Sequence, residues 1–142
     1  MTAPPSIDLS PLQRALAVLR EALAFWHAQP EGSKLKPHLR SAVIQSFEFC
    51  YELSLRSLRR VLIERAAAAD PVVDLSFNDL LRLAADAGLM QEPLRWRDWR
   101  ELRNATSHAY DEAKAQAVAT GAEAFSDDAA ALLSALEADL AG

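Results

Sequence analysis

The residues best suited to chemistry lie in the segment from Trp96 to Tyr110, which reads WRDWRELRNATSHAY. Within eight positions it brings together Arg103, Asn104, His108 and Tyr110. An arginine fork can hold a phosphate and neutralise charge that builds up in a transition state. An imidazole can move a proton near neutral pH, and an asparagine can orient either group by hydrogen bonding. These residue types favour a site that binds and acts on a phosphate group.

If the segment is helical, its side chains fall on two neighbouring stripes about 100° apart. The first stripe holds Trp96, Trp99, Arg103, Ser107 and Tyr110, and the second holds Asn104, His108 and Asp111. The same spacing is also typical of ordinary packing, since aromatic residues on a helical stripe usually belong to a core. An arginine near carboxylates on a helix is usually an exposed ion pair. Periodicity alone leaves both interpretations open.

Helical patterns also predict the elements that position this segment. We expect the first helix to begin at Ser10, with Pro11 in its first turn and Gln13 completing a capping box. The breakers between 30 and 37 end it. A second, longest helix is predicted over about 38–69, ended by the pair Asp70-Pro71 because a residue before proline avoids the helical region.

Three further helices are predicted after that. The first of them starts at Ser76 and ends at Gly88, a favourable residue for the end of a helix. The next runs over about 92–110, and the last spans about 126–140, opened by the acids of Ser126-Asp127-Asp128. No segment alternates with a period of two for long. We therefore expect an all-α, up-and-down bundle of four to five helices in one domain over residues 1–142.

The predicted apolar faces recur at spacings of three and four residues. They comprise Leu12, Leu16, Leu19, Leu23 and Trp26 in the first helix, Ile44, Phe47, Tyr51, Leu55, Leu58 and Leu62 in the second, and Phe77, Leu80, Leu81, Ala84 and Leu89 in the third. Val43, Cys50 and Val61 widen the face of the second helix.

Composition excludes several classes of site. The chain of 142 residues has four glycines and no glycine-rich stretch, which argues against a phosphate-binding glycine loop. A single cysteine, Cys50, and the widely spaced histidines His27, His38 and His108 argue against a zinc site, so we expect no metal and no cofactor. No apolar run approaches 18 residues and the first residues lack signal-peptide blocks, so we expect a cytoplasmic protein.

The net charge of −5 is distributed unevenly. Residues 1–110 hold 14 Lys and Arg against 13 Asp and Glu, whereas residues 111–142 hold one against seven. Twelve of the fifteen basic residues are arginines, which suit planar contacts to phosphate or carboxylate. The overall charge therefore does not exclude a nucleic-acid partner, because the field near the motif can be positive.

The segment from Arg103 to Asp111, RNATSHAYD, resembles the arginine–(four to six residues)–histidine motif of HEPN domains. It is most similar to the HEPN proteins encoded beside a minimal nucleotidyltransferase, also described as nucleotidyltransferase substrate-binding proteins. Further blocks resemble the same subfamily. They are Ile44–Leu53, with a cysteine where threonine is common, Ser76–Asp79 with Ala84–Leu89, and Trp96 seven residues before the arginine. The resemblance covers about residues 10–140.

The resemblance implies a homodimer in which the motifs of two chains line a shared cleft. It implies the toxin of a toxin–antitoxin pair, a metal-independent endoribonuclease in which the RNA 2′-hydroxyl attacks the adjacent phosphate. His108 would transfer protons, Arg103 would stabilise the developing charge, and Asn104 would position His108 or a phosphate oxygen. Such a nucleophile makes RNA rather than DNA the substrate. No membrane partner is expected.

In such pairs the antitoxin, a minimal nucleotidyltransferase, transfers AMP to the tyrosine of the motif, a position that Tyr110 matches. AMPylation there would block the cleft. Ser107, Glu48 and Glu52 are possible cleft residues, although a solvated pair between Glu52 and Arg56 is the favoured interpretation of that stripe.

Two other functions stay open beside the ribonuclease. In one, the chain is a non-catalytic nucleotide- or substrate-binding subunit of a two-component nucleotidyltransferase. In the other it is a structural helical dimer with a vestigial motif, which the complete set of motif residues disfavours.

Overall fold

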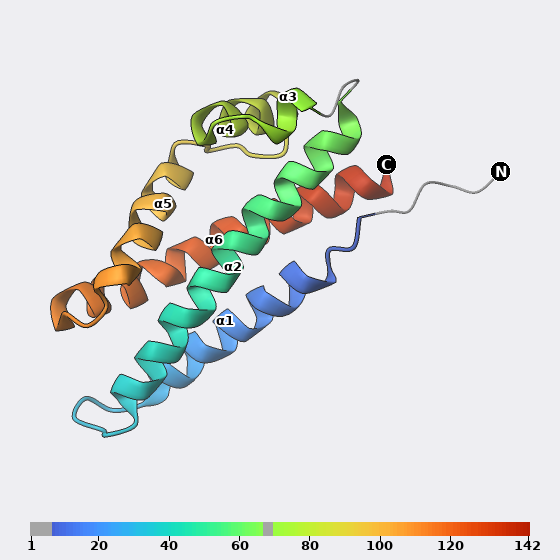
Figure 1. Cartoon of the computed structure of the whole chain (residues 1–142). Coiled ribbons are helices and arrows are strands. Elements are labelled where there is room, and N and C mark those ends of the chain that lie inside the picture. The colour runs from blue at the N-terminus through green and yellow to red at the C-terminus, as the bar shows by residue number, and fades with distance from the viewer. Residues whose placement is uncertain (1–6, 67–69) are drawn as a thin grey trace.

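The computed structural model describes residues 7–66 and 70–142, and it shows helices and no strand in that part of the chain. Within these residues five helices have ten or more residues, and there are also a four-residue helix and a 3₁₀ turn (Figure 1). In order they are α1 (Ser10–Ala28), α2 (Lys36–Arg65), α3 (Asp70–Val73), α4 (Phe77–Asp86), α5 (Arg95–Ala105), the 3₁₀ turn η1 (Thr106–His108) and α6 (Glu112–Ala141).

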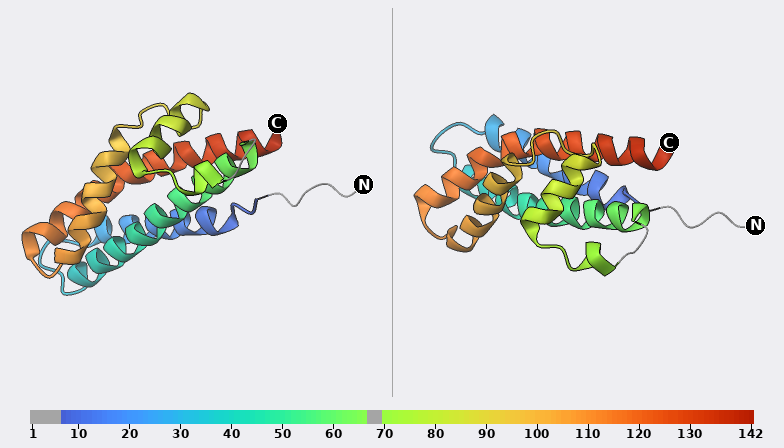
Figure 2. Two further views of the ribbon diagram at one scale, coloured as in Figure 1. Left: turned by 45° about the horizontal axis from the view of Figure 1, so that its top comes forward. Right: turned by 90° about the horizontal axis from the view of Figure 1, so that it is seen from above.

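The three long helices α1, α2 and α6 lie alongside one another and form the body of the molecule (Figures 1 and 2). The connection between α1 and α2 is at one end of this body, and α3 and α4 are at the other. The shorter α5 runs beside α2 and leads into η1, after which α6 returns through the body. This arrangement places the motif turn at the same end as the α1–α2 connection.

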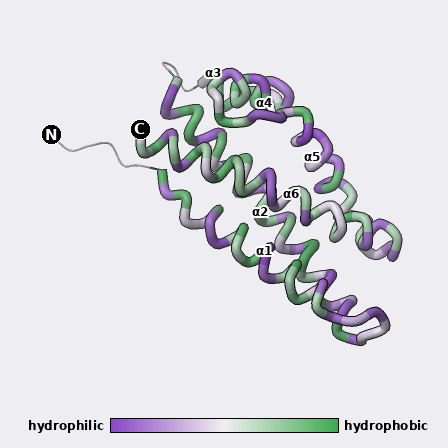
Figure 3. The backbone as a smooth tube through the Cα atoms, turned by 180° about the vertical axis from the view of Figure 1, so that it is seen from behind, coloured by the Kyte–Doolittle hydropathy of each residue, from purple (hydrophilic) through white to green (hydrophobic). Residues whose placement is uncertain are grey.

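The predicted apolar faces form the core, as expected for amphipathic helices. The five residues of the predicted apolar face of α1 are at most 6% exposed, and Phe47 and Phe125 are fully buried. The ring of Phe125 packs edge-on against Phe47, Trp96 and Trp99, with centroid distances of 4.9, 5.7 and 5.9 Å. Hydrophobic and hydrophilic residues alternate along each long helix (Figure 3). Two predicted core residues, Leu55 and Phe77, are only half-buried at the edge of this core.

Helix starts follow the predictions in part. Ser76 caps α4 as expected, because its hydroxyl accepts a hydrogen bond from the amide of Asp79. The predicted capping box at Ser10 is wrong, although α1 begins there. The amide and hydroxyl of Ser10 both donate to the carboxylate of Asp8, so its side chain is engaged upstream. Gln13 reaches across to Glu137 of α6 instead.

The end of the long second helix differs from the prediction. α2 ends at Arg65, and the predicted extension over 67–69 lies outside the described residues. The pair Asp70-Pro71 does not end a helix but opens the short α3. A proline is tolerated in the first turn of a helix, because the amide hydrogen that it lacks would have no partner there.

The largest correction concerns the motif segment and the helix after it. The predicted helix over 92–110 ends at Ala105, and α6 begins at Glu112 rather than near Ser126. Asp111 caps α6 by accepting a hydrogen bond from the amide of Lys114, and the alanine-rich sequence that follows favours helix. The acids predicted to open a helix therefore lie in the middle of α6. Within the described part, no helix combines the length and the apolar character needed to cross a membrane.

Candidate functional site

Arg103 lies in the last turn of α5 and is held by side chains from two directions. Its Nη2 donates to Glu52 Oε1 at 2.9 Å and lies 3.7 Å from Glu48 Oε2, both on α2. Its Nη1 donates to the hydroxyl of Thr106 at 3.0 Å, and that hydroxyl in turn donates to the carbonyl of Arg103. The arginine side chain keeps 31% of its surface exposed. A guanidinium fixed in this way has little freedom to turn, yet a phosphate can still approach it.

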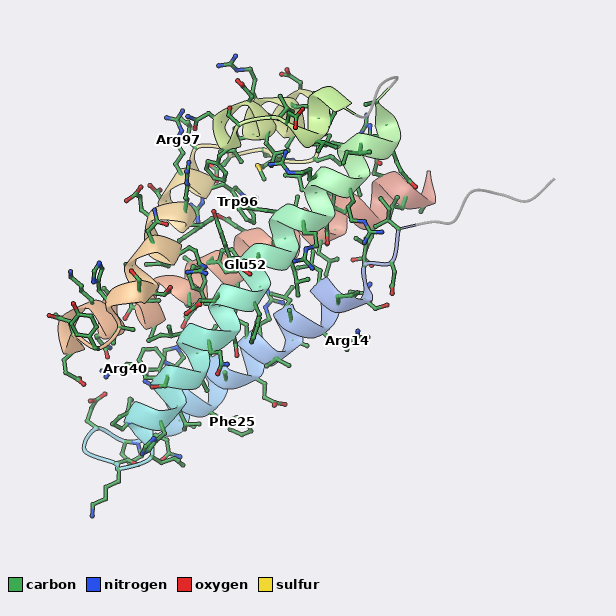
Figure 4. The ribbon with its side chains drawn as sticks, in the orientation of Figure 1. Arg14, Phe25, Arg40, Glu52, Trp96 and Arg97 are labelled. Carbon is green, nitrogen blue, oxygen red and sulfur yellow. The ribbon has the colours of Figure 1, made fainter. Side chains whose placement is uncertain are left out.

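Glu48 and Glu52 reach Arg103 because they are four residues apart on the outer side of α2. The opposite side of the same turns is buried, with Phe47, Cys50 and Ser54 fully enclosed. The favoured interpretation of Glu52 as a partner of Arg56 is wrong, because its carboxylate accepts from Arg103 instead. Figure 4 shows Glu52 on the part of α2 beside α5, and Trp96 between these two helices, whereas Arg97 points outward.

The electrostatics of this cluster stabilise the charged form of the arginine. The hydrogen bond that Arg103 donates to Glu52 raises the pKa of Arg103, and the nearby charge of Glu48 acts in the same direction against the effect of burial. Beneath the cluster, burial raises the pKa of the Tyr51 hydroxyl. The site therefore presents a permanent cation flanked by two carboxylates.

His108 and Tyr110 lie beyond the helix, in and after the η1 turn. His108 Nδ1 is 3.4 Å from the Tyr110 hydroxyl, and the two rings are 6.0 Å apart and nearly perpendicular. Tyr110 is 85% exposed, and His108 is exposed as well. The turn is closed by backbone bonds from Ala109 to Thr106 and from Asp111 to His108. Both side chains are therefore open to an incoming molecule.

The structure does not keep the predicted stripes intact, because α5 ends at Ala105, part of the way along them. Ser107 donates its hydroxyl to the carbonyl of Asn104, and both side chains are exposed at the helix end. Trp96 and Trp99 of the first stripe are buried, so for these two the packing interpretation is correct. The fold brings Arg103 to Glu48 and Glu52, and it brings His108 to Tyr110 on the adjoining turn.

Two residues that the sequence did not single out hold this segment in place. Asp128 of α6 accepts from Arg95 Nε at 2.7 Å and from Trp99 Nε1 at 2.8 Å, which ties α5 to α6. Thr106 anchors the arginine, and its position three residues after Arg103 was a detectable signal. Asp128 had no such signal, since its partners are about thirty residues away in the sequence.

α5 and α6 also approach each other closely at a glycine. A Cβ added to Gly121 would lie 2.8 Å from Leu102 Cδ2, so glycine lets the leucine one residue before Arg103 pack against α6. No group of three metal-binding side chains occurs among the described residues. The chemical groups that the described residues place at this site are a fixed guanidinium, an imidazole, a phenol and two carboxylates.

Comparisons with known proteins agree with this architecture. The model of a family described as nucleotidyltransferase substrate binding protein like matches residues 7–138. A relative from Haemophilus influenzae named probable ribonuclease HepT is 41% identical over 88 residues, which are 62% of this chain. The chain thus spans about 60% of the length of that relative.

The solved structure of a Haemophilus influenzae protein supports the fold over almost the whole chain. HI0074, described as showing the fold of a substrate binding domain of a nucleotidyltransferase, matches with a TM-score of 0.84 and 34% identity. The match covers 92% of this chain and 99% of that one, and it confirms the all-α class. Together with the family match, it shows that this chain belongs to the family of nucleotidyltransferase substrate-binding-like proteins.

Proposed function

We propose that this chain is the toxin of a pair with a minimal nucleotidyltransferase and that it cleaves RNA. The observation that carries the proposal is the fixed guanidinium of Arg103 followed, five residues later, by the exposed imidazole of His108. A relative named as a probable ribonuclease supports the same activity.

The cleavage follows from what these side chains can do. His108 accepts the proton of the RNA 2′-hydroxyl as the 2′-oxygen forms a bond to the adjacent phosphorus. The bond from phosphorus to the 5′-oxygen breaks, and the products are a cyclic phosphate and a 5′-hydroxyl once the leaving oxygen is protonated. Arg103 binds the phosphate oxygens as their negative charge grows. Asn104 and Ser107, exposed beside them, orient the phosphate.

A second copy of the chain completes the proposed site. Phe49 follows Glu48 on the outer side of α2 and is 57% exposed, and Tyr110 is also exposed near the motif. Large exposed apolar residues beside a charged cluster favour a protein interface. In a homodimer two motifs would share one cleft. Phe49→Asp should then shift the mass measured by sedimentation from that of a dimer to that of a monomer, and an unchanged mass would remove this part of the proposal.

The partner nucleotidyltransferase would act on Tyr110. The phenol is the most exposed large hydrophobic side chain among the described residues and lies beside His108, so it is open to an enzyme that transfers AMP. The added nucleotide would carry a negative phosphate and a base into the space in front of the motif. This modification would exclude RNA from the site.

Incubating the purified protein with RNA tests the proposed activity. We expect cleavage products that end in a cyclic phosphate, and a decrease of about 10²–10⁴-fold with His108→Ala. His38→Ala is the matched control, because His38 is an exposed histidine on the first turn of α2, outside the motif. Equal cleavage by His108→Ala and wild type would contradict the proposal.

A second function, a non-catalytic subunit that presents a substrate to the nucleotidyltransferase, is favoured by the description of HI0074 as a substrate binding domain. It predicts no cleavage, a stable complex with the nucleotidyltransferase and nucleotide binding that requires Arg103. Cleavage that depends on His108 would exclude this function. An absence of RNA cleavage together with retained nucleotide binding would favour this second function.

A further inference from the structure

A basic cavity lies at the end of the bundle that carries the motif turn. It has a volume of about 370 Å³ and lies among the α1–α2 connection, the first turns of α2 and Gln116 of α6. Lys34, Lys36 and Arg40 line it, with Glu31 as its acidic residue. Three cations against two carboxylates, Glu31 and the Glu112 that pairs with Arg40, leave this cavity positive in a chain whose net charge is −5.

The ion pairs in this cavity are asymmetric in a way that suits an incoming anion. Lys36 is 19% exposed and pairs with Glu31, which is 92% exposed; Arg40 is 14% exposed and pairs with Glu112, which is 84% exposed. The cations are thus embedded in the protein, whereas their carboxylate partners extend into solvent. An incoming phosphate can therefore take the place of either carboxylate without moving the cation.

Further contacts fix the cations in place. Lys36 Nζ donates to the carbonyl of Gln29 at 2.8 Å and lies 5.8 Å from the centre of the Trp26 ring. Arg40 Nη2 donates to Glu112 at 2.9 Å, and Arg40 Nε is buried without a hydrogen-bond partner among the described residues. The arginine therefore retains a donor that no described residue uses. Figure 4 shows Arg40 at the lower part of α2.

The start of α6 connects the motif turn to the residues that line the cavity. Glu112, the partner of Arg40, is two residues after Tyr110 and directly follows Asp111, which caps α6. Gln116 is one helical turn further along and lines the cavity itself. A strand of RNA bound at His108 can therefore continue over Glu112 into the cavity. Proteins that bind single strands commonly use such a basic groove to follow the backbone.

We propose that this cavity is a second phosphate site, which binds an RNA phosphodiester next to the one at the motif. Lys34, Lys36 and Arg40 bind the phosphate oxygens in place of Glu31 and Glu112. The inference rests on the proposed function in one respect, namely that RNA is the substrate. In this proposal the three basic residues increase the affinity for the RNA strand and take no part in the proton transfer.

RNA binding measured against salt concentration tests this site. The probe is a short fluorescein-labelled single-stranded RNA, and fluorescence anisotropy is measured with the full chain carrying His108→Ala, so that the probe stays intact. Each lost phosphate contact should lower the slope of log K against log salt by about 0.7, or roughly 5-fold in affinity at 0.1 M salt. We expect this loss for Lys34→Gln and an opposite change, tighter binding, for Glu31→Gln.

An exposed ion pair at the other end of the molecule provides matched controls. Asp79 and Arg82 of α4 are 4.0 Å apart, and both side chains are exposed. Arg82→Gln and Asp79→Asn alter the net charge as the two test variants do, and neither should change the slope. Lys34 and Glu31 are exposed as well, so all four variants should fold, which circular dichroism would verify.

The outcomes separate this inference from the proposed function. Binding that weakens with Lys34→Gln supports the second phosphate site, even if the wild-type protein cleaves no RNA. Cleavage by the wild type with equal slopes for all four variants would overturn the site and leave the ribonuclease proposal standing. A protein that binds no RNA, or one whose slope changes equally with Lys34→Gln and Arg82→Gln, would also overturn it.

Discussion

The two halves of the motif are held very differently. Arg103 is fixed by Glu48 and Glu52 from α2 and by Thr106 from its own turn. His108 lies in a 3₁₀ turn, exposed, with a long contact of 3.4 Å to the hydroxyl of Tyr110. The first half depends on packing between two helices, whereas the second depends on the shape of a short turn.

This difference matches the two roles that we propose, charge stabilisation by Arg103 and proton transfer or modification at the exposed turn. A group that stabilises charge is most effective when its position is fixed before the reaction, because no reorganisation is then needed. A group that takes and releases protons, or accepts a modification, must be reachable from outside. The residues of α2 that hold Arg103 stand on a helix whose opposite side is buried in the core; we call this part of α2 the platform behind Arg103. The turn that carries His108 is held only by short-range backbone hydrogen bonds from Ala109 and Asp111.

Among changes around Arg103, the largest effect is expected from removing the arginine side chain itself. Arg103→Ala should lower RNA cleavage by about 10²–10³-fold, as expected for the loss of one group that stabilises transition-state charge. The melting temperature should change little, since half-exposed ion pairs contribute about 1 kcal/mol or less. Cleavage rates and thermal unfolding are measured on the same sample. An unfolded variant, or one with normal cleavage, would contradict the division described above.

A smaller effect is expected from weakening the contact between Arg103 and Glu52. Glu52→Gln removes the charge from the shortest contact between Arg103 and α2, but it keeps an amide oxygen that can accept the hydrogen bond. We expect roughly a 10-fold loss in cleavage rate. Glu64→Gln, an exposed change on the same helix, is the control and should have no effect. Faster cleavage by Glu52→Gln would show that the carboxylate competes with the phosphate instead of orienting the arginine.

The rigidity of the platform behind Arg103 can be tested through pH. Burial raises the pKa of the Cys50 thiol from its ordinary 9.0 to about 12. Above pH 9 the unfolded chain loses this proton while the folded chain keeps it. Stability is thus greatest below pH 9, and the free energy of unfolding should fall by about 1.4 kcal/mol per pH unit as the pH rises toward 12.

Urea unfolding of the wild type and of Cys50→Ala at pH 8 and pH 10 measures this contribution. The variant should be less stable at pH 8, because it leaves a small cavity, but it should lose less stability between the two pH values. Parallel losses in both proteins would mean that the thiol is accessible and that α2 opens beneath Glu48 and Glu52.

The smallest effect on stability is expected in the exposed half. Tyr110→Phe should change the free energy of unfolding by less than about 0.5 kcal/mol, since the side chain is 85% exposed. Its effect on modification should be complete. After co-expression with a minimal nucleotidyltransferase, mass spectrometry should find one added AMP on the wild type and none on Tyr110→Phe.

The other tyrosine of the chain provides the control for this experiment. Tyr51 is 6% exposed, so Tyr51→Phe should retain the added AMP if the protein folds. If the Tyr110→Phe variant still carried an added AMP at some other residue, the assignment of Tyr110 would be contradicted.

The sequence predicted much of the fold because the core is periodic. The stripes on α1 and α2 are buried as expected, and Ser76 begins α4 through the hydrogen bond that its type suggests. The prediction failed where local signals compete. An alanine-rich stretch lets α6 begin at Glu112, and the helix with the motif ends at Ala105, so His108 and Tyr110 are not on one helix with Arg103.

For the candidate site, the sequence by itself supplied the chemical groups, since Arg103, His108 and Tyr110 stand out by their types and by their resemblance to the HEPN motif. Only the tertiary structure decided that Glu52 binds Arg103, that Asp128 holds α5 on α6, and that Lys36 and Arg40 share a cavity near the motif turn. Periodicity reports which face of a helix is apolar. It carries no record of which helices become neighbours, and contacts between residues about thirty or fifty positions apart depend on that arrangement.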